Sequence, residues 1–270
     1  MDILKRKQAA LTDRAWQEID GAVRDVLVAR LCGRKVVDVE GPLGVDTSAI
    51  NLGRLDVAEV TKPGAVRYGI RQVQPLVEGR LNFDLDVWEL DNVERGARDL
   101  DLKAAEEAAL KMACFEDTAI FNGFAAGGIK GLTQIEAHQP IALTLEPAAL
   151  LGALTRGIVA MNDAAVDGPF HLVVGPQVFK TLSVQQTSGY SLSKQVTELI
   201  GGQVHYSTVL KGALLVSGRG GDFELTIGQD LSVGYDSRQN GKVTLFVGES
   251  FTFRVLDPAG SLYLPLKGKK

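Results

Sequence analysis

The feature that most limits how this chain can fold is an extended, weakly apolar stretch over residues 45–78. Two segments within it, 52–60 and 65–77, have the composition of strands, and the sequence Lys-Pro-Gly at 62–64 separates them with a turn signal. The pattern predicts a long two-stranded arm with a Pro-Gly tip. The arm has too few large apolar side chains for a core of its own, and an isolated hairpin is only marginally stable in water. We therefore expect the arm to lie on another subunit.

A strand with regular alternation follows the arm and reaches a tryptophan. The side chains expected on its apolar face are Leu81, Phe83, Leu85 and Val87, and those on its polar face are Arg80, Asn82, Asp84, Asp86 and Trp88. A large aromatic side chain on a polar face commonly packs under a loop or at a subunit interface. The alternative is a platform for a flat ligand, with Arg80 on the same face as Trp88. Both interpretations stay open at this point.

Two helical patterns flank this strand in the sequence. Thr12 or Asp13 can cap the first helix, whose apolar side chains recur at helical spacing until Gly33 ends it. The second and longest pattern follows a cap at residues 99–101 and covers 104–121, where small side chains at helical spacing allow other layers to approach closely. Residues 34–40 are expected to form a short strand.

The rest of the chain has the pattern of a separate α/β unit followed by further strands. The predicted helices cover 147–161, 176–182 and 193–200, and the predicted strands cover 171–175, 203–207, 213–217, 223–227, 231–235, 242–247, 250–256 and 262–266. The late strands need partners earlier in the chain, and the strand after the arm is the best placed. We therefore expect domains that are discontinuous in sequence.

Composition and motifs argue against nucleic acid, membranes and catalysis. The net charge of −4 disfavours nucleic acid as the main partner, and no apolar run approaches the roughly 20 residues that span a bilayer. Cys32 and Cys114 make neither a disulfide framework nor a metal cluster, which fits a reducing, cytoplasmic setting. His138, His171 and His205 lack zinc-binding spacing. A long chain with an arm and no catalytic constellation favours assembly over enzymatic activity.

Segments spread from one end of the chain to the other share the pattern of one family. The longest runs from Leu85 to Gly96, with the sequence Leu-Asp-Val-Trp-Glu-Leu-Asp-Asn-Val-Glu-Arg-Gly, and another runs from Gly228 to Tyr235. The remaining segments are 4–6, 10–12, 16–20, 33–42, 115–117, 130–132, 168–169, 220–223 and 249–253. In these segments and in their order, the chain resembles the encapsulins, shell proteins of bacterial and archaeal nanocompartments that were once described as linocin-type bacteriocins.

The resemblance implies an α+β fold, that of the major capsid proteins of tailed phages. This fold has a peripheral domain with a long spine helix, an axial domain and an extension loop. Mapped on this sequence, the peripheral domain comprises 1–44, 79–132 and 223–257, the extension loop 45–78, and the axial domain 133–222 and 258–270.

The resemblance also implies a function, that of the shell protomer of a self-assembling icosahedral nanocompartment with sixty or more copies. The shell would enclose a cargo enzyme, either a ferritin-like iron oxidase, which would serve iron storage, or a dye-decolorizing peroxidase. A terminal targeting peptide of the cargo would dock beside the N-terminal helix, on Val26, Arg34, Asp38, Asp230 and Leu231. Small solutes would pass through pores, and the loop Ser188, Gly189 and Tyr190 is the candidate for the fivefold pore. The implied partners are other copies and cargo, without nucleic acid or membrane, inside the cytoplasm.

Some encapsulins bind a flavin, and the two positions implied for it are Arg80 and Trp88, which are both present here. No cofactor is expected to be required, and FMN is an optional ligand that would stack on Trp88. Three alternatives stay open. They are a flavin-binding oxidoreductase that uses the same two residues, a peptidase or bacteriocin activity, for which no nucleophile–base pair is seen, and a prophage capsid protein.

Overall fold

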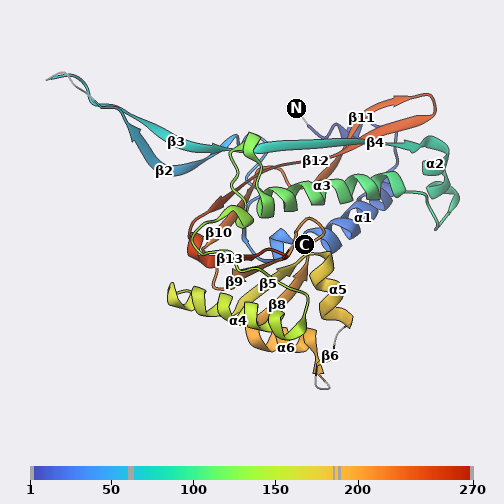
Figure 1. The fold of residues 1–270 in the computed structure, drawn as a ribbon. Helices are drawn as coiled ribbons and strands as arrows, with labels where there is room; N and C mark the ends of the chain where they lie inside the picture. Colours follow the sequence, from blue (N-terminus) through green and yellow to red (C-terminus); the bar gives the residue numbers. More distant parts are fainter. Residues whose placement is uncertain (1–2, 60–63, 185, 188–189, 268–270) are drawn as a thin grey trace.

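The computed structural model describes residues 3–59, 64–184, 186–187 and 190–267. Two sheets, each with helices against it, make up the body of the molecule, and a long hairpin extends away from one of them (Figure 1). The sheets draw on segments far apart in sequence, so neither is built from one continuous stretch of chain.

The central strand of the five-stranded sheet is β12 (Lys242–Val255). Along one edge it pairs antiparallel with β4 (Val77–Asp86). Along its other edge it pairs antiparallel with β11 (Ser232–Gln239) and then with β10 (Phe223–Ile227). The short strand β1 (Asp38–Glu40) adds in parallel to β10. The late strands therefore do find an early partner in β4, as expected.

Two predicted strands differ in the structure. The two strands expected over 242–256 are one continuous strand, in which Glu249 occupies an inward position between Val247 and Phe251. The strand expected over 34–40 is reduced to β1, because the 3₁₀ turn η2 (Gly33–Lys35) takes up its first half.

Two helices cover the inner face of this sheet, α1 (Asp13–Arg30) and α3 (Lys103–Asn122). Thr12 is the residue that caps α1, because its hydroxyl accepts the N–H of Ala15 at 3.1 Å. The shared core takes bulky side chains from α1 and the sheet and small ones from α3, among them Ile19, Val23, Phe83, Leu245, Ala105 and Ala109. The alanines let α3 lie close beneath β4 and β12, as Figure 1 shows.

The strand β4 ends at Asp86, and the helix α2 (Val87–Arg95) begins immediately, so Trp88 lies on a helix. The Asp86 side chain accepts the N–H of Trp88 at 2.8 Å and thereby caps the helix. The expected common strand face for Arg80 and Trp88 is therefore wrong. At about 3.3 Å per residue, Arg80 lies about 20 Å of strand away from Asp86.

The second sheet has four strands in the order β13 (Ser261–Leu264), β9 (Ala213–Ser217), β5 (Phe170–Val174) and β8 (Gly201–Tyr206). The helices packed on one face of it are α4 (Pro147–Asp163), α5 (Pro176–Val184) and α6 (Leu192–Ile200). Its opposite face packs against the end of α3, where Val173 and Val216 meet Ile120 and Phe121 in a joint core. That core also takes in side chains of β10 and β12, so the two sheets are firmly joined.

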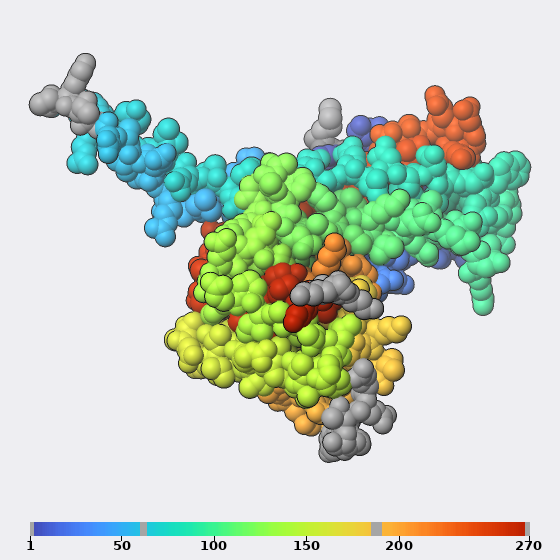
Figure 2. Space-filling model, viewed as in Figure 1, coloured from blue at the N-terminus to red at the C-terminus, as the bar shows by residue number. Residues whose placement is uncertain are grey.

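The arm consists of β2 (Ala49–Val57) and β3 (Gly69–Pro75), which pair antiparallel with an irregularity between Asn51 and Leu55. It projects far from the body of the molecule (Figure 2). Residues 60–63 of its predicted tip lie outside the described residues. The remaining short elements are η1 (Arg6–Gln8), η3 (Ala125–Gly127), η4 (Leu132–Gln134), η5 (Pro258–Gly260), β6 (Gln186–Thr187) and β7 (Tyr190–Ser191).

Candidate functional site

A groove of about 420 Å³ runs between α1 and the start of β11, and we call it the α1 groove. Its apolar walls come from Leu4, Val23, Leu27, Val28, Leu31, Leu231 and Val233, and its polar groups from Arg6, Asp20, Arg24, Arg34, Asp230 and Ser232. Val28 is 68% exposed, although Val23 and Leu27 on the same helix are buried. An open apolar channel with charged edges can accept an extended or helical peptide with apolar side chains.

The N-terminal segment forms one wall of the α1 groove. The carbonyl of Leu4 accepts the N–H of Tyr235 at 2.8 Å, which attaches the segment to β11. The Arg6 guanidinium donates to both carboxylate oxygens of Asp20 at 2.6 Å and lies 4.1 Å from the centre of the Trp16 ring system. Ion pairing and cation–π contact thus hold this wall in place.

Two residues that line the α1 groove, Arg34 and Asp230, belong to a charged cluster with the buried Glu116 and Glu249, which we call the Arg34 cluster. Arg34 donates from Nε to Glu116 at 2.9 Å and from Nη2 to Glu116 at 2.5 Å. Its Nη1 donates to Asp230 at 2.9 Å. Burial by itself would lower the pKa of the Arg34 guanidinium, but the bonds to Glu116 and Asp230 raise it, so Arg34 is a permanent cation.

Asp117, next to Glu116 on α3, fixes the backbone that carries Arg34. Its carboxylate accepts the N–H groups of Cys32 and Gly33 at 3.1 and 2.8 Å. Burial raises the pKa of Asp117 to about 7, although these two backbone bonds oppose the shift. Any larger residue at Gly33 would require Ile120 to move, because a Cβ would lie 2.4 Å from its Cδ1.

The structure brings together three of the five residues predicted to bind a cargo peptide. Arg34, Asp230 and Leu231 line the α1 groove. Val26 lines a second hollow between α1 and α3, together with Ala22, Ala29 and Leu110 and the charged Asp25, Arg30, Glu106 and Glu107. Asp38 lies in neither of them. Its carboxylate accepts the N–H of Gly221 at 2.5 Å, beside a cavity of about 140 Å³ where the two sheets meet.

Two histidines that are far apart in sequence meet at this junction. Nε2 of His205 on β8 and Nδ1 of His171 on β5 are 3.4 Å apart. Burial, the neighbouring His171 and then Lys35 lower the pKa of His205 to about 4, so this ring is neutral at pH 7. The two rings pack against each other, with their centres 5.3 Å apart. Among the described residues, no group of three or more His, Cys, Asp or Glu side chains could hold a metal ion.

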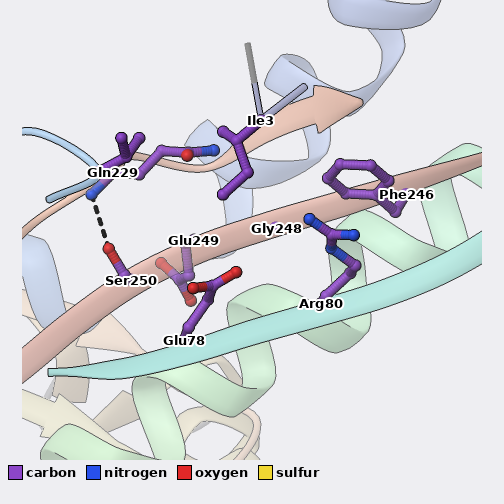
Figure 3. Close-up of a pocket in the computed structure, with 9 residues that line it drawn as sticks. Ile3, Glu78, Arg80, Gln229, Phe246, Gly248, Glu249 and Ser250 are labelled. Atoms are coloured by element: carbon purple, nitrogen blue, oxygen red, sulfur yellow. Dashed lines mark hydrogen bonds between the residues drawn. The ribbon is translucent and has the colours of Figure 1, made fainter. Parts of the chain in front are cut away.

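The two residues predicted to bind a flavin lie in different settings. Arg80 belongs to a small pocket on the outer face of the sheet, where its guanidinium is 3.8 Å from the centre of the Phe246 ring (Figure 3). The Phe246 ring itself lies flat over the strands, where a Cβ at Gly234 would collide with it at 2.1 Å. Trp88 is 71% exposed, and the Arg95 guanidinium lies 5.5 Å from its ring centre.

The pore prediction falls largely outside the part of the chain that the structure describes. Ser188 and Gly189 are not among the described residues, and Tyr190 begins β7. Within the described ranges, no helix has both the length and the apolarity to cross a bilayer.

Sequence reasoning missed Glu116 and Glu249, the two buried acids of the Arg34 cluster. A signal for Glu249 was present, because it stands at an inward position in the apolar alternation of residues 243–255. Cys114 is half-buried, and its Sγ lies 3.7 Å from Oγ1 of Thr208.

Solved structures with the same fold are capsid and particle proteins. A virus-like particle from Pyrococcus furiosus matches with a TM-score of 0.68 and 16% identity over 92% of this chain and 98% of that chain. The capsid of an empty GTA particle matches with a TM-score of 0.59 and 16% identity over 88% of this chain and 90% of that chain. These likenesses confirm the predicted α+β fold of the phage-capsid type.

Sequence comparison identifies the family. The Linocin_M18 family, described as encapsulating protein for peroxidase, matches residues 1–252. The type 1 encapsulin shell protein of Rhodospirillum rubrum is 41% identical over 99% of this chain and 97% of its own length. That of Mycolicibacterium paratuberculosis is 36% identical over 94% of this chain and 95% of its own length. Both are named as shell proteins, in keeping with the expectation of a structural protein and not an enzyme. The chain therefore belongs to the encapsulin shell protein family.

Proposed function

We propose that this chain assembles with copies of itself into a closed icosahedral shell, with sixty or more copies, that encloses a cargo enzyme. The observation that carries the proposal is the arm. Leu55, Ile70 and Val73 are exposed along it, Ile70 at 67%, and apolar side chains on a projecting hairpin are typical of a surface that another copy covers. Family membership supports the same conclusion.

Assembly is tested by the size of the purified protein. Light scattering after size-exclusion chromatography and negative-stain microscopy are expected to show hollow particles of uniform diameter. A stable monomer of 28.9 kDa at micromolar concentration and neutral pH contradicts the proposal.

We further propose that the α1 groove docks the targeting peptide of the cargo. The apolar wall around Leu27, Val28 and Leu231 suits leucine or isoleucine side chains, and the half-exposed carboxylate of Asp230 suits a basic end of the peptide. The family description supports a peroxidase as cargo, and a ferritin-like oxidase, which would give the shell a role in iron storage, is the second cargo class that we propose. Co-expression of either enzyme with the shell, with and without its terminal peptide, tests docking.

Several finer assignments belong to the same proposal. The sheet memberships support a peripheral domain of 1–44, 79–132 and 223–257, an extension loop of 45–78 and an axial domain of 133–222 and 258–270. Ser188, Gly189 and Tyr190 remain our candidates for the fivefold pore. We place the shell in the cytoplasm as a nanocompartment, with other copies and cargo as its partners and without nucleic acid or membrane.

Flavin binding is a second, separate proposal, and its support is the exposed Trp88. No cofactor is needed for the shell, and FMN would be an additional ligand. Because about 20 Å of strand separates Arg80 from the helix that bears Trp88, a site that uses both residues has to draw them from two copies. The proposal fails if purified shells show no flavin absorbance and Trp88→Ala leaves FMN affinity unchanged.

A further inference from the structure

Glu249 is a buried acid without a matching donor. It is 1% exposed, and among the described residues neither oxygen of its carboxyl group receives a hydrogen bond from an N–H or hydroxyl group. The nearest cationic nitrogen, Nη2 of Arg34, is 3.6 Å from Oε2, beyond hydrogen-bonding distance. An ionised carboxylate in such a place is strongly unfavourable, because burial removes its hydration and nothing replaces it.

The only cation in the Arg34 cluster is already engaged. Glu116, also fully buried, takes the Nε and Nη2 donors of Arg34, and Asp230 takes Nη1. An ionised Glu249 would add a second buried negative charge next to Glu116 with no donor left for it. Burial and the neighbouring Glu116 raise the pKa of Glu249 well above its usual value, and this outweighs the opposing effect of Arg34.

We propose that Glu249 is a positioning residue of the α1 groove: it keeps its proton at neutral pH, donates it to the carboxylate of Glu116, and so holds Arg34 in place in the groove. The shared proton leaves Glu116 as the one buried negative charge against Arg34, which then presents Nη1 to the half-exposed Asp230 at the groove edge. The proposal rests on the docking function of the α1 groove.

Loss of the Glu249 proton would change the position of Arg34 in the α1 groove. The charged groups that face Glu249 are Glu116 from α3, Arg34 from η2 and Asp230 from the loop between β10 and β11. With Glu249 ionised, two buried carboxylates compete for one guanidinium, and Arg34 is drawn away from Asp230. Peptide binding to the α1 groove should therefore weaken at the alkaline pH where Glu249 loses its proton, by up to about tenfold per pH unit if binding requires the proton.

The first test observes the proton itself. Infrared spectra of the assembled protein contain a carbonyl stretch of protonated carboxyl groups that is distinct from carboxylate bands. The spectra are recorded above pH 7, because Asp117, whose pKa is about 7, is then ionised and no longer contributes to this band. We expect a protonated-carboxyl band that persists in wild-type protein and is absent from Glu249→Gln. The matched control is Glu18→Gln, an exposed glutamate on α1, which should leave the band unchanged.

The second test measures docking. The probe is a rhodamine-labelled, leucine-rich synthetic peptide that ends in two lysines, added to full-length protein and followed by fluorescence anisotropy from about pH 6 to about pH 10. Wild type and Glu18→Gln should lose affinity with rising pH. Glu249→Gln, which is neutral at every pH and can still donate to Glu116, should keep its affinity at high pH, where wild type loses it.

The outcomes separate the two proposals. If neither wild type nor any variant binds the peptide at any pH, the docking function of the α1 groove is wrong, and the infrared band still decides the state of Glu249. If wild-type protein lacks the band, the inference is wrong even where docking is seen. It is also overturned if wild type and Glu249→Gln have the same pH profile. The wild-type titration needs no variant, so it stands even if Glu249→Gln fails to fold.

Discussion

The carboxylate of Asp117 on the spine helix α3 accepts the backbone N–H of Gly33 at 2.8 Å, and this contact joins the end of α1 to the core. The same oxygen also accepts the N–H of Cys32 at 3.1 Å. One acceptor therefore satisfies two backbone donors that the end of a helix and a tight turn leave buried. The position of Arg34, the next residue, follows from it.

Asp117→Ala should destabilise the protein by about 1–3 kcal/mol, because it leaves two buried N–H groups without an acceptor. Asp117→Asn should cost less, since both N–H groups bond the same oxygen and the amide retains one. Urea unfolding at pH 7 checks the order of the two variants. Equal losses for alanine and asparagine would show that the acceptor oxygen is not what matters.

Acid should weaken the junction between the two sheets through His205. Its pKa in the folded protein is about 4, below the value of 6.5 for an unperturbed histidine. The folded state thus binds fewer protons than the unfolded state between these values, so stability is full above about pH 6.5 and is lost as the pH falls towards 4. Thermal melting across this range checks the direction.

The matched variants for this experiment are His205→Gln and His138→Gln. The first should flatten the fall in melting temperature towards acid pH, because the group that must remain neutral is gone. His138 makes a single contact through Nε2 to the carbonyl of Ala259 at 2.9 Å, away from the pair, and its replacement should leave the slope unchanged. A slope that is the same in all three proteins would exclude His205 as the source.

Removing residues 53–73 should abolish closed particles while leaving the body folded. The deleted part belongs to the arm, whereas the cores of both sheets lie elsewhere. Negative-stain microscopy should show small oligomers or aggregates, and circular dichroism should retain the helix and strand signal. Intact shells from this variant would count against the role of the arm.

A gentler pair of variants on β3 supports that test. Ile70→Asp puts a charge on an apolar position of the arm, and Gln72→Asp puts the same charge on a polar, exposed position. Only Ile70→Asp should reduce the yield of particles, because only this variant removes an apolar side chain that a neighbouring copy would bury.

Val28→Asp should lower peptide affinity of the α1 groove by about tenfold or more, because the peptide would have to cover a carboxylate. Val28 is largely exposed, so the free energy of unfolding should change by no more than about 0.5 kcal/mol. The control is Val28→Leu, which keeps the wall apolar and should bind as wild type does. Anisotropy with the labelled peptide measures both.

Much of the fold could be predicted from the sequence because its elements carry clear periodicity. Phe83 and Leu85 are buried on alternate positions of β4 as the pattern requires, and the end of α3 falls close to the predicted Phe121. The arm could be predicted for the opposite reason, since its lack of large apolar side chains excludes a core of its own.

The errors arose where one residue decides between two local structures. Alternation continues through Trp88, but the side chain of Asp86 caps a helix there, and a capping bond outweighs one more residue of strand pattern. The Arg34 cluster was beyond sequence reasoning, because its members come from residues 34, 116, 230 and 249 and only the folded sheet brings them together. Val26, predicted to bind the cargo peptide, lines the hollow between α1 and α3 and not the α1 groove, so its role stays a prediction.

The central position of β12 has a consequence for how the protein is made in the cell. β4, β10 and β11 all pair with a strand that follows all three of them in the sequence, so it is synthesised after them. Until that strand has left the ribosome, the root of the arm has no sheet to join and no subunit can offer a finished contact surface. The sheet is therefore complete only once β12 has been synthesised, and a subunit cannot offer its finished contact surface to other copies before that point.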